Sequence, residues 1–242
     1  YQANFTLGSR WCLDGSPLGL FHRLLQRQPT AFSAFFQLPE DRYVLSFSPE
    51  LFLAWKGDLL WTLPMKGPRP RGSTPDEDRV LKQELVESPK DRAENIMIVD
   101  LLRNDLGKLA RPGTVQVPRM FQVETYPTVH QMVSRVEARL RPEARTPEAL
   151  FQALFPGGSV TGAPKLRAVE LLQELEPEER GVYCGAIGIL FPWKEAVFNL
   201  AIRTLALQGG RAWYGVGGGI VLDSRPEAEW SEVENKTAFL RT

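Results

Sequence analysis

Apolar and turn-forming residues alternate over the first third of the chain. Short aromatic and β-branched runs bounded by turn residues predict β-strands at residues 31–38, 42–48, 51–57 and 58–63. The segment LGLFHRLLQRQ (residues 18–28) interrupts them with the spacing of a helix. The opening YQANFTL reads like the middle of a strand and has no starting methionine, so we expect the N-terminal part of a longer chain to be absent.

A helical period replaces this alternation after residue 74. Pro75 in STPDED suits the first turn of a helix, and VLKQELVES follows at residues 80–88. The helical pattern continues over residues 91–109, where Gly107 is a candidate C-cap. Further helices are predicted at residues 146–155 and 163–176 and from about residue 225.

Strands return in the second half, at residues 114–118, 120–126, 128–140, 184–191, 196–208 and 211–222. Because strands and helices come in blocks and not in strict βαβ alternation, the pattern favours the α+β class, with mostly antiparallel β-sheets flanked by helices. No Pro/Gly-rich linker divides the 242 residues, so we expect residues 1–242 to form a single domain.

Charge and cysteine usage narrow the function classes. The 29 basic and 29 acidic residues cancel, so the chain lacks the electrostatic signature of a nucleic-acid-binding protein. No apolar run approaches the ~20 residues that a membrane-spanning helix needs. Cys12 and Cys184 form no CxxC pair, and we interpret them as reduced, buried thiols of a cytoplasmic protein.

Two pairs of carboxylates recur at helical spacing. Asp91 and Glu94 are three residues apart in one predicted helix, as are Glu229 and Glu232 in the last one. Residues at this spacing share a helix face, where like charges repel unless a cation lies between them. If the helices pack side by side, the cluster suits Mg²⁺, which prefers oxygen ligands. The alternative is a solvated acidic face on each helix.

Two glycine-rich segments are candidate anion sites. GVGGG (residues 215–219) would weaken a strand, which indicates either a β-bulge or a backbone that approaches a ligand closely. PGGSVTGAPK (residues 156–165) lacks the GxxxxGK[ST] phosphate motif. A glycine-rich loop that opens a helix still presents free amides to an anion, and Thr161 and Lys165 would add contacts.

Several single polar residues lie within apolar strands. Arg203 and Tyr183 would be costly to bury without partners, and Arg203 is suited to clamp a carboxylate, although a structural ion pair is equally consistent. His130 reads either as a satisfied core residue or as a catalyst. Burial of Glu50 would raise its pKa towards use as a general acid.

The basic stretch LPMKGPRPRG (residues 63–72) allows two interpretations. It is either a rigid surface loop stiffened by prolines, or it holds Lys66 against an acidic substrate. The inventory of cations, acidic pairs and glycines indicates a small polycarboxylate substrate.

Taken together, the motifs resemble the chorismate-utilising enzymes. The resemblance rests on SPELFL, PMKGPRPRG, DRAENIMIVDLLRNDLG, VETYPTVHQMVS, FPGGSVTGAPK, CGAIG, AIRT, GVGGGIVLDS and EWSEVENK, which cover nearly the whole chain in that order. It implies the chorismate-binding enzyme fold and a catalytic domain over residues 1–242.

The resemblance also implies roles for individual residues. Glu94 and Glu232 would hold Mg²⁺, with Asp91 and Glu229 supporting through water, and the metal would grip the ring carboxylate of chorismate. Glu50 matches the general acid that protonates the departing C4 hydroxyl. His130 matches a histidine that lies near this hydroxyl. The substrate-binding positions implied by the resemblance or by the loops are Tyr183, Arg203, Gly217, Lys236, Thr161 and Gly67.

Two positions discriminate within the family. Members that add water carry a lysine base where this chain has Gln2, so the resemblance favours ammonia as the nucleophile. At the position of Lys66, the chain resembles the aminodeoxychorismate synthase component I branch, whose members carry a lysine that forms a covalent intermediate. Anthranilate-forming members have alanine at this position. Pro68 stands where the family usually has threonine and removes a hydroxyl near C4.

The implied activity is amination of chorismate to 4-amino-4-deoxychorismate for p-aminobenzoate and folate synthesis. Ammonia would come from a glutamine amidotransferase subunit. The alternatives are anthranilate synthase component I, which adds ammonia at C2 and eliminates pyruvate, and a non-catalytic carboxylate-binding module.

Overall fold

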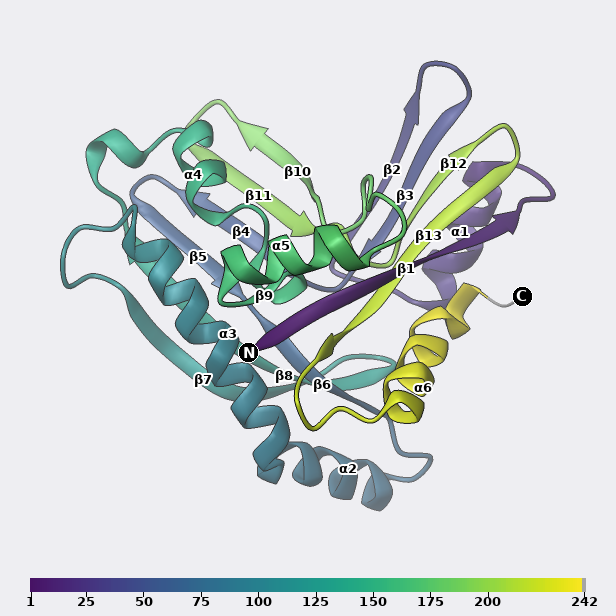
Figure 1. Ribbon diagram of the computed structural model, residues 1–242, viewed down its shortest axis with the longest axis horizontal. Coiled ribbons are helices and arrows are strands. Elements are labelled where there is room, and N and C mark those ends of the chain that lie inside the picture. Colours follow the sequence, from purple (N-terminus) through teal and green to yellow (C-terminus); the bar gives the residue numbers. More distant parts are fainter. Residues whose placement is uncertain (241–242) are drawn as a thin grey trace. The chain divides into compact units, whose positions relative to one another are not determined.

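The computed structural model describes residues 1–240, which form two antiparallel β-sheets with helices against them (Figure 1). The chain divides into two compact units. Unit 1 comprises residues 1–50, residues 159–187 and the chain from Asn199 onward, and unit 2 comprises residues 51–158 and 188–198. Each unit is therefore assembled from segments that are distant in sequence.

Unit 1 is built on a six-stranded sheet in the order β2-β3-β12-β13-β1-β9. The long strands β1 and β13 pair in continuous antiparallel register from Ala3↔Ile220 to Cys12↔Arg211. Helices α5 and α6 pack against β1 and β13, respectively. The elements are β1 (Gln2–Cys12), α1 (Pro17–Arg27), β2 (Phe32–Leu38), β3 (Arg42–Ser48), β9 (Gly162–Ala163), α5 (Lys165–Leu175), β12 (Thr204–Gln208), β13 (Arg211–Ile220) and α6 (Pro226–Thr237).

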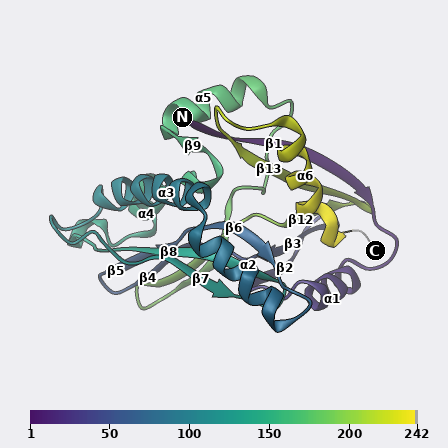
Figure 2. The same ribbon diagram turned by 90° about the horizontal axis from the view of Figure 1, so that it is seen from below.

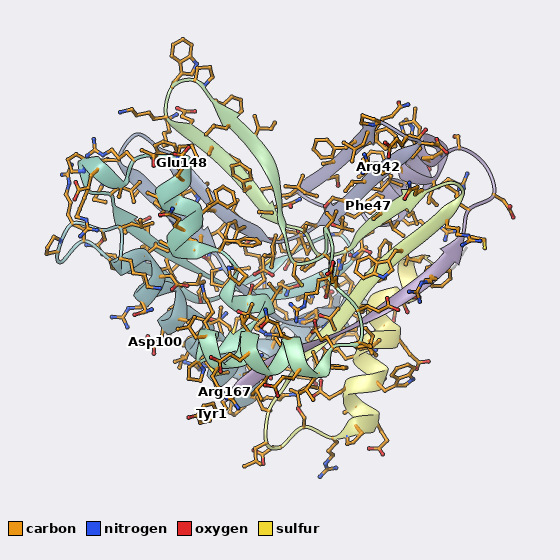
Figure 3. The ribbon with its side chains drawn as sticks, turned by 45° about the horizontal axis from the view of Figure 1, so that its top comes forward. Tyr1, Arg42, Phe47, Asp100, Glu148 and Arg167 are labelled. Atoms are coloured by element: carbon orange, nitrogen blue, oxygen red, sulfur yellow. The ribbon has the colours of Figure 1, made fainter. Side chains whose placement is uncertain are left out.

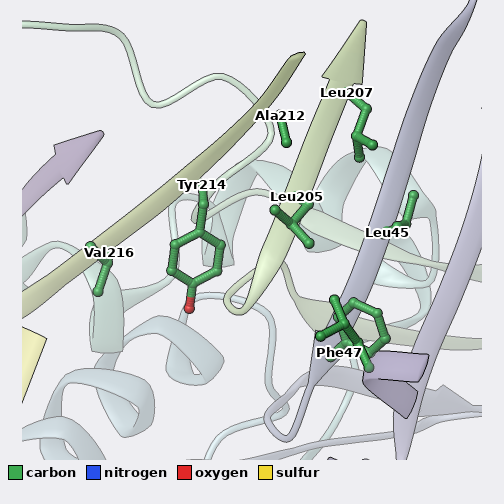
Figure 4. Close-up of a cluster of buried hydrophobic side chains, with 8 residues drawn as sticks. Leu45, Phe47, Leu205, Leu207, Ala212, Tyr214 and Val216 are labelled. Atoms are coloured by element: carbon green, nitrogen blue, oxygen red, sulfur yellow. The ribbon is translucent and has the colours of Figure 1, made fainter. Parts of the chain in front are cut away.

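The core of unit 1 lies on one face of this sheet. Leu45 and Phe47 on β3 are fully buried with Leu205 on β12 and Tyr214 on β13 (Figure 4). Figure 3 labels Arg42 and Phe47 near opposite ends of β3, where Arg42 is exposed and Phe47 is buried. Helix α1 closes the cluster, because its Phe21 ring stacks on Phe47 with centroids 5.2 Å apart.

Unit 2 is built on the seven-stranded sheet β10-β11-β4-β5-β8-β6, with β7 paired to β8. Helix α3 lies along β8, and α2 contacts β6, β7 and β8 (Figure 2). The elements are β4 (Leu51–Lys56), β5 (Leu59–Leu63), β6 (Met65–Pro70), α2 (Pro75–Glu87), α3 (Pro89–Gly107), β7 (Gln116–Thr125), β8 (Val129–Arg139), α4 (Pro147–Leu154), β10 (Ala186–Phe191) and β11 (Glu195–Leu200). Of strands β10 and β11, only residues 188–198 belong to this unit.

The α+β prediction with mostly antiparallel sheets is confirmed, because the pairings among β1, β2, β3, β9, β12 and β13 and those among β4 to β8 are antiparallel. The predicted helices are present, and Thr74 caps α2 by accepting from the backbone N–H of Glu77. The single-domain assignment of residues 1–242 stays a prediction. Among residues 1–240, no helix combines the length and the apolar character needed to cross a membrane.

Four details differ from the sequence predictions. Residues 65–70 form strand β6, not a loop. The predicted strand 196–208 is divided into β11 and β12, because Arg203 takes a left-handed conformation with φ +49°. Gly107 is the last residue of α3 and not its cap. Cys12 is exposed, whereas Cys184 is buried as expected.

The glycines of residues 215–219 do not form a bulge. They lie inside the regular β13 strand, where each missing side chain makes room for a neighbour. A Cβ at Gly217 would collide with the backbone of Phe5, and one at Gly219 with the side chain of Gln2. Close packing against β1 explains Gly217 and Gly219, whereas Gly215 makes room for the ring of Tyr183 and Gly218 faces Glu229 of α6.

Candidate active site

Lys66 of unit 2 lies on β6, next to an irregularity in the strand. Met65 and Lys66 pair with Val133 and Met132 on β8, and the register then shifts before Arg69 pairs with His130. Gly67, inside this bulge, has φ +59°, a conformation that favours glycine. Pro68 is tolerated there because a bulged residue does not have to donate to the ladder.

The bulge brings the β6 backbone against helix α3. A Cβ added at residue 67 would lie 2.5 Å from Oδ1 of Asp91 and 2.8 Å from Cδ1 of Leu85. The Asp91 carboxylate therefore fills the place of a side chain at residue 67. One of the predicted metal-supporting acids is thus brought beside the lysine-bearing strand within unit 2.

The two arginines of the same strand region are fixed by ion pairs. Arg69 donates to Asp91 at 2.7 Å. Arg71 makes a bidentate pair with Asp78 on α2, at 2.7 and 2.9 Å, and donates to the carbonyl of Tyr126. The side chain of Lys66, by contrast, makes no hydrogen bond or ion pair with any residue that the structure describes. The two arginine side chains are therefore held by ion pairs within unit 2, whereas the Lys66 side chain is not.

His130 is 1% exposed and sits on β8 opposite Arg69. Its Nε2 is 2.9 Å from Oδ1 of Asp78, and its Nδ1 is 3.0 Å from Oγ1 of Thr125. Both ring nitrogens are thus engaged within unit 2. A direct catalytic role for His130 stays a prediction.

The acidic pair of unit 2 lies on α3. Asp91 is 6% exposed and bound to Arg69, whereas Glu94 is half-buried and 3.8 Å from Lys90 one turn away. Serine 88 caps the helix by accepting from the N–H of Asp91, which places Asp91 in the first turn. The positive end of the helix dipole also favours a carboxylate there.

The acidic pair of unit 1 lies on α6 against a glycine of β13. A Cβ at Gly218 would lie 3.2 Å from Oε2 of Glu229 and 4.0 Å from Oε1 of Glu232. Glu229 also accepts from the hydroxyl of Ser224 at 2.7 Å. The missing side chain at residue 218 therefore leaves a cradle that both carboxylates face.

Lys236 joins this acidic pair to the glycine strand. Its Nζ lies 2.6 Å from Oε1 of Glu232 and donates to the carbonyl of Gly217 at 2.8 Å. The hydroxyl of Tyr214 donates to the backbone carbonyl of Lys236 at 3.0 Å, which fixes the end of α6 on the sheet. Gly217, Lys236 and Glu232, all predicted site residues, are therefore brought together.

Arg203 of unit 1 is half-buried in the left-handed turn between β11 and β12. Burial lowers the pKa of its guanidinium, and Tyr214 partly opposes that shift. Within the described part of the chain, its guanidinium has no hydrogen bond or ion pair. A half-buried arginine without a protein partner is suited to bind a carboxylate.

Tyr183 is buried beside β13. A Cβ at Gly215 would collide with its ring, and Trp213 packs against it edge-on with centroids 6.4 Å apart. Burial raises the pKa of the Tyr183 hydroxyl well above its ordinary value, so this hydroxyl remains a neutral donor. Burial likewise raises the pKa of the Cys184 thiol to about 12, which makes it unreactive.

Glu50 and the glycine-rich loop meet within unit 1. Glu50 is 8% exposed, and its Oε1 accepts from the hydroxyl of Ser159 at 2.8 Å. Thr161 is buried next to β9, and α5 begins at Lys165 after Pro164. The sequence reasoning missed Ser159 and Asp78, because Ser159 is distant in sequence from Glu50 and Asp78 is distant from His130.

The predicted metal ligands are acidic side chains from two helices. Taken by itself, each unit contains no group of three or more His, Cys, Asp or Glu side chains that could hold a metal, as far as residues 1–240 are concerned. The two predicted pairs are carboxylates only, which is the ligand chemistry that Mg²⁺ prefers. The Gly218 cradle beside Glu229 and Glu232 is consistent with this assignment.

Comparison with known proteins gives a consistent result. Residues 1–242 match the family described as chorismate binding enzyme. Aminodeoxychorismate synthase component 1 of Salmonella typhimurium is 44% identical over 236 residues, which are 98% of this chain and 52% of that protein. Anthranilate synthase component 1 of Saccharolobus solfataricus is 40% identical over 233 residues, 96% of this chain and 55% of that protein. The chain thus spans about half the length of the curated relatives it matches.

Solved structures share the fold. Anthranilate synthase component I from Streptococcus pneumoniae superposes with a TM-score of 0.90 and 33% identity, over 100% of this chain and 53% of that one. The menaquinone-specific isochorismate synthase of Escherichia coli gives a TM-score of 0.87 at 21% identity, over 99% and 55%, a likeness of fold alone.

Proposed function

Because the chain belongs to the chorismate binding enzyme family, we propose that it catalyses the aminodeoxychorismate synthase reaction, with Lys66 as the nucleophile. The observation that carries this proposal is the contrast within residues 63–72. Arg69 and Arg71 are bound to Asp91 and Asp78, respectively, whereas the side chain of Lys66 has no hydrogen-bond or ion-pair partner among the described residues. Several curated relatives named aminodeoxychorismate synthase component 1, at 39–44% identity, support the same assignment.

The proposed chemistry has two displacements. The Lys66 amine forms a bond to C2 of chorismate, the ring double bonds shift, and the C4–O bond breaks. Glu50 gives its proton to the departing oxygen, which leaves as water. Ammonia then bonds to C4, the double bonds shift back, and the C2–N bond returns its electrons to Lys66. The new ammonium group gives a proton to the Glu50 carboxylate, so the sum is chorismate plus ammonia to 4-amino-4-deoxychorismate plus water.

Other residues bind and orient the substrate in this proposal. Arg203, Tyr183, Lys236 and the backbone at Gly217 bind the enolpyruvyl carboxylate, Thr161 adds a contact, and Gly67 keeps the backbone beside Lys66 free of a side chain. Glu94 and Asp91 in unit 2, and Glu232 and Glu229 in unit 1, are the proposed Mg²⁺ ligands and their supports. Bound Mg²⁺ would neutralise the ring carboxylate of chorismate.

Ammonia is proposed to come from a glutamine amidotransferase partner, in keeping with the designation of the relatives as component 1. The product would serve p-aminobenzoate and folate synthesis after a separate lyase reaction. Two cysteines that form no disulfide are consistent with the cytoplasmic location that we propose.

Product analysis tests the proposal. The protein is incubated with chorismate, Mg²⁺ and ammonium, and the products are separated and identified by mass spectrometry. A product in which an amine replaces the hydroxyl and the enolpyruvyl group is retained supports the proposal. Anthranilate with released pyruvate would contradict it in favour of the anthranilate synthase reaction, and chorismate binding without turnover would indicate a non-catalytic module.

Lys66 is tested separately. Lys66→Ala should abolish aminodeoxychorismate formation, whereas Lys56→Ala, which removes an exposed lysine paired with Glu195 in the same unit, should not. Without ammonia, the wild-type protein should gain the mass of chorismate minus one water, on the peptide that contains Lys66. Unchanged turnover by Lys66→Ala would remove this residue as the nucleophile.

A further inference from the structure

The Asp78 carboxylate connects three parts of unit 2. It accepts a bidentate pair from Arg71 at the end of β6 and a hydrogen bond from the N–H of Gly72 at 2.9 Å. Its Oδ1 also faces Nε2 of His130 on β8 at 2.9 Å. Asp78 itself lies in the first turn of α2, so one side chain links a helix to two paired strands.

These contacts determine which nitrogen of His130 carries the proton. Arg71, followed by Gly72 and His130, holds the pKa of Asp78 well below its ordinary value, so this carboxylate is ionised and only accepts. Nε2 of His130 must therefore donate to it. In a ring that carries a single proton, Nδ1 is then the acceptor, and the Thr125 hydroxyl donates to it at 3.0 Å. The Thr125 oxygen in turn accepts from Nζ of Lys82 at 3.2 Å, which leaves its hydrogen for His130.

The same contacts fix the strand that carries Lys66. Arg69 and His130 are register partners across β6 and β8, so a fixed His130 and a fixed Arg71 hold the chain directly after the bulge at Gly67. Asp91 also holds this segment, through its ion pair with Arg69. The β6 strand is thus attached to α3 by one ion pair and to α2 by the other.

We propose that Asp78 is a positioning residue for Lys66, which acts by fixing Arg71 and by holding His130 in the Nε2–H tautomer. His130 is then a positioning residue as well, because its one N–H is donated to Asp78 and is not available to protonate a substrate. This inference rests on the proposed role of Lys66, but its structural half can be tested without chorismate.

Nitrogen NMR tests the tautomer directly, because the chain has only two histidines and His22 is exposed. In long-range ¹H–¹⁵N spectra of the labelled protein at neutral pH, His130 should show a protonated Nε2 and an unprotonated Nδ1. Asp78→Ala should remove this fixed pattern, whereas Asp78→Asn, whose amide oxygen still accepts, should preserve it. Asp76→Ala, an exposed neighbour paired with Arg79, is the control.

Kinetics test the positioning. Asp78→Ala should lower kcat for chorismate amination by up to ~100-fold, the cost of a misplaced reacting group, with little change in KM. Asp78→Asn should recover part of that loss, and Asp76→Ala should match the wild type. A doubly protonated His130, a proton on Nδ1, or spectra and kcat unaffected by Asp78→Ala would each overturn the inference. The expected NMR pattern in a protein that does not turn over chorismate would instead refute the proposed function.

Discussion

The carboxylate of Asp91 occupies the space that a side chain at residue 67 would need, with Oδ1 2.5 Å from the position of a Cβ on Gly67. This relationship joins the proposed nucleophile's strand to the helix that carries a predicted metal-supporting acid, within unit 2. Two features favour glycine at residue 67: the positive φ of the backbone and the close approach of the Asp91 carboxylate. The two reasons can be separated by experiment.

Gly67→Ala should destabilise the protein more than Gly57→Ala does. Gly57 has nearly the same φ, +62°, but a Cβ there would meet no atom within 4 Å. Both alanines pay the left-handed backbone strain of roughly 1–2 kcal/mol. Only Gly67→Ala must also displace Asp91 and Leu85, at a further cost of about 1–3 kcal/mol.

Urea denaturation of the two variants measures the difference in the free energy of unfolding. Gly67→Ala should also lose activity, whereas Gly57→Ala should keep it. Equal destabilisation of the two variants would show that Asp91 moves aside freely and that the contact does not constrain β6.

Arg203→Leu should separate stability from function. Burial lowers the pKa of this guanidinium, which means that its positive charge destabilises the folded protein. Tyr214 opposes this shift only in part, and no side chain of the described residues forms a hydrogen bond or ion pair with the guanidinium. The substitution should therefore leave the melting temperature unchanged or raise it, while the KM for chorismate rises by about 10–100-fold through loss of a charge-assisted hydrogen bond.

Thermal unfolding and steady-state kinetics on the same sample check both halves of this expectation. Arg42→Leu, which changes an exposed arginine on β3, is the control and should leave KM unchanged. A large fall in melting temperature for Arg203→Leu would mean that the arginine is a structural group and not a substrate clamp.

The sequence pattern predicted correctly those helices and strands whose start signals or apolar runs lie within the element itself. Helix α2 carries its own start signal in Thr74 and Pro75, and the strands of the first third carry their own apolar runs. Strand β6 was missed because three prolines in ten residues indicate a loop, whereas pairing with β8 and a bulge accommodate them. The break at Arg203 was missed because the apolar run continues through it.

The site was predictable as a set of residues but not as a set of contacts. Spacing and residue type gave the acidic pairs, Arg203 and Lys66 as candidates, and the resemblance to a family implied their roles. It could not indicate that Arg69 and Arg71 are bound to Asp91 and Asp78, because ion-pair partners follow from tertiary packing. The glycines of β13 are explained by neighbours such as Gln2 and Tyr183, which no local pattern identifies.

Asp58 predicts an acid-dependent loss of stability in unit 2. Arg139 donates to it at 2.7 Å, Arg111 lies at 3.6 Å, and these arginines lower the pKa of Asp58. Because the folded-state pKa is lowered, the stabilisation is fully present above the pKa of the unfolded chain, about 3.9, and is lost as pH falls below it. Asp58→Asn should be less stable than the wild type at pH 6 and should approach it towards pH 2.

Melting temperatures of the two proteins between pH 6 and pH 2 test this expectation. Salt provides a control, because the pair is partly exposed and added NaCl should reduce the difference at pH 6. A difference that stays constant with pH would show that the carboxylate charge does not contribute.

The acidic pairs give the last prediction. Glu94→Gln and Glu232→Gln should each lower Mg²⁺ affinity by more than the ~10–100-fold that loss of an outer-shell partner costs, and they should abolish Mg²⁺-dependent turnover. Asp91→Asn and Glu229→Gln, proposed to act through water, should fall within that range. Glu148→Gln, an exposed acid in the first turn of α4 (Figure 3), is the matched control.

Calorimetric titration with Mg²⁺ measures affinity independently of turnover. In Glu232→Gln, Lys236 loses its carboxylate partner but keeps the carbonyl of Gly217, so the fold of unit 1 should survive and the loss can be assigned to the metal. If both Glu94→Gln and Glu232→Gln retain Mg²⁺-dependent turnover, the acidic pairs are solvated helix faces and the metal assignment is wrong.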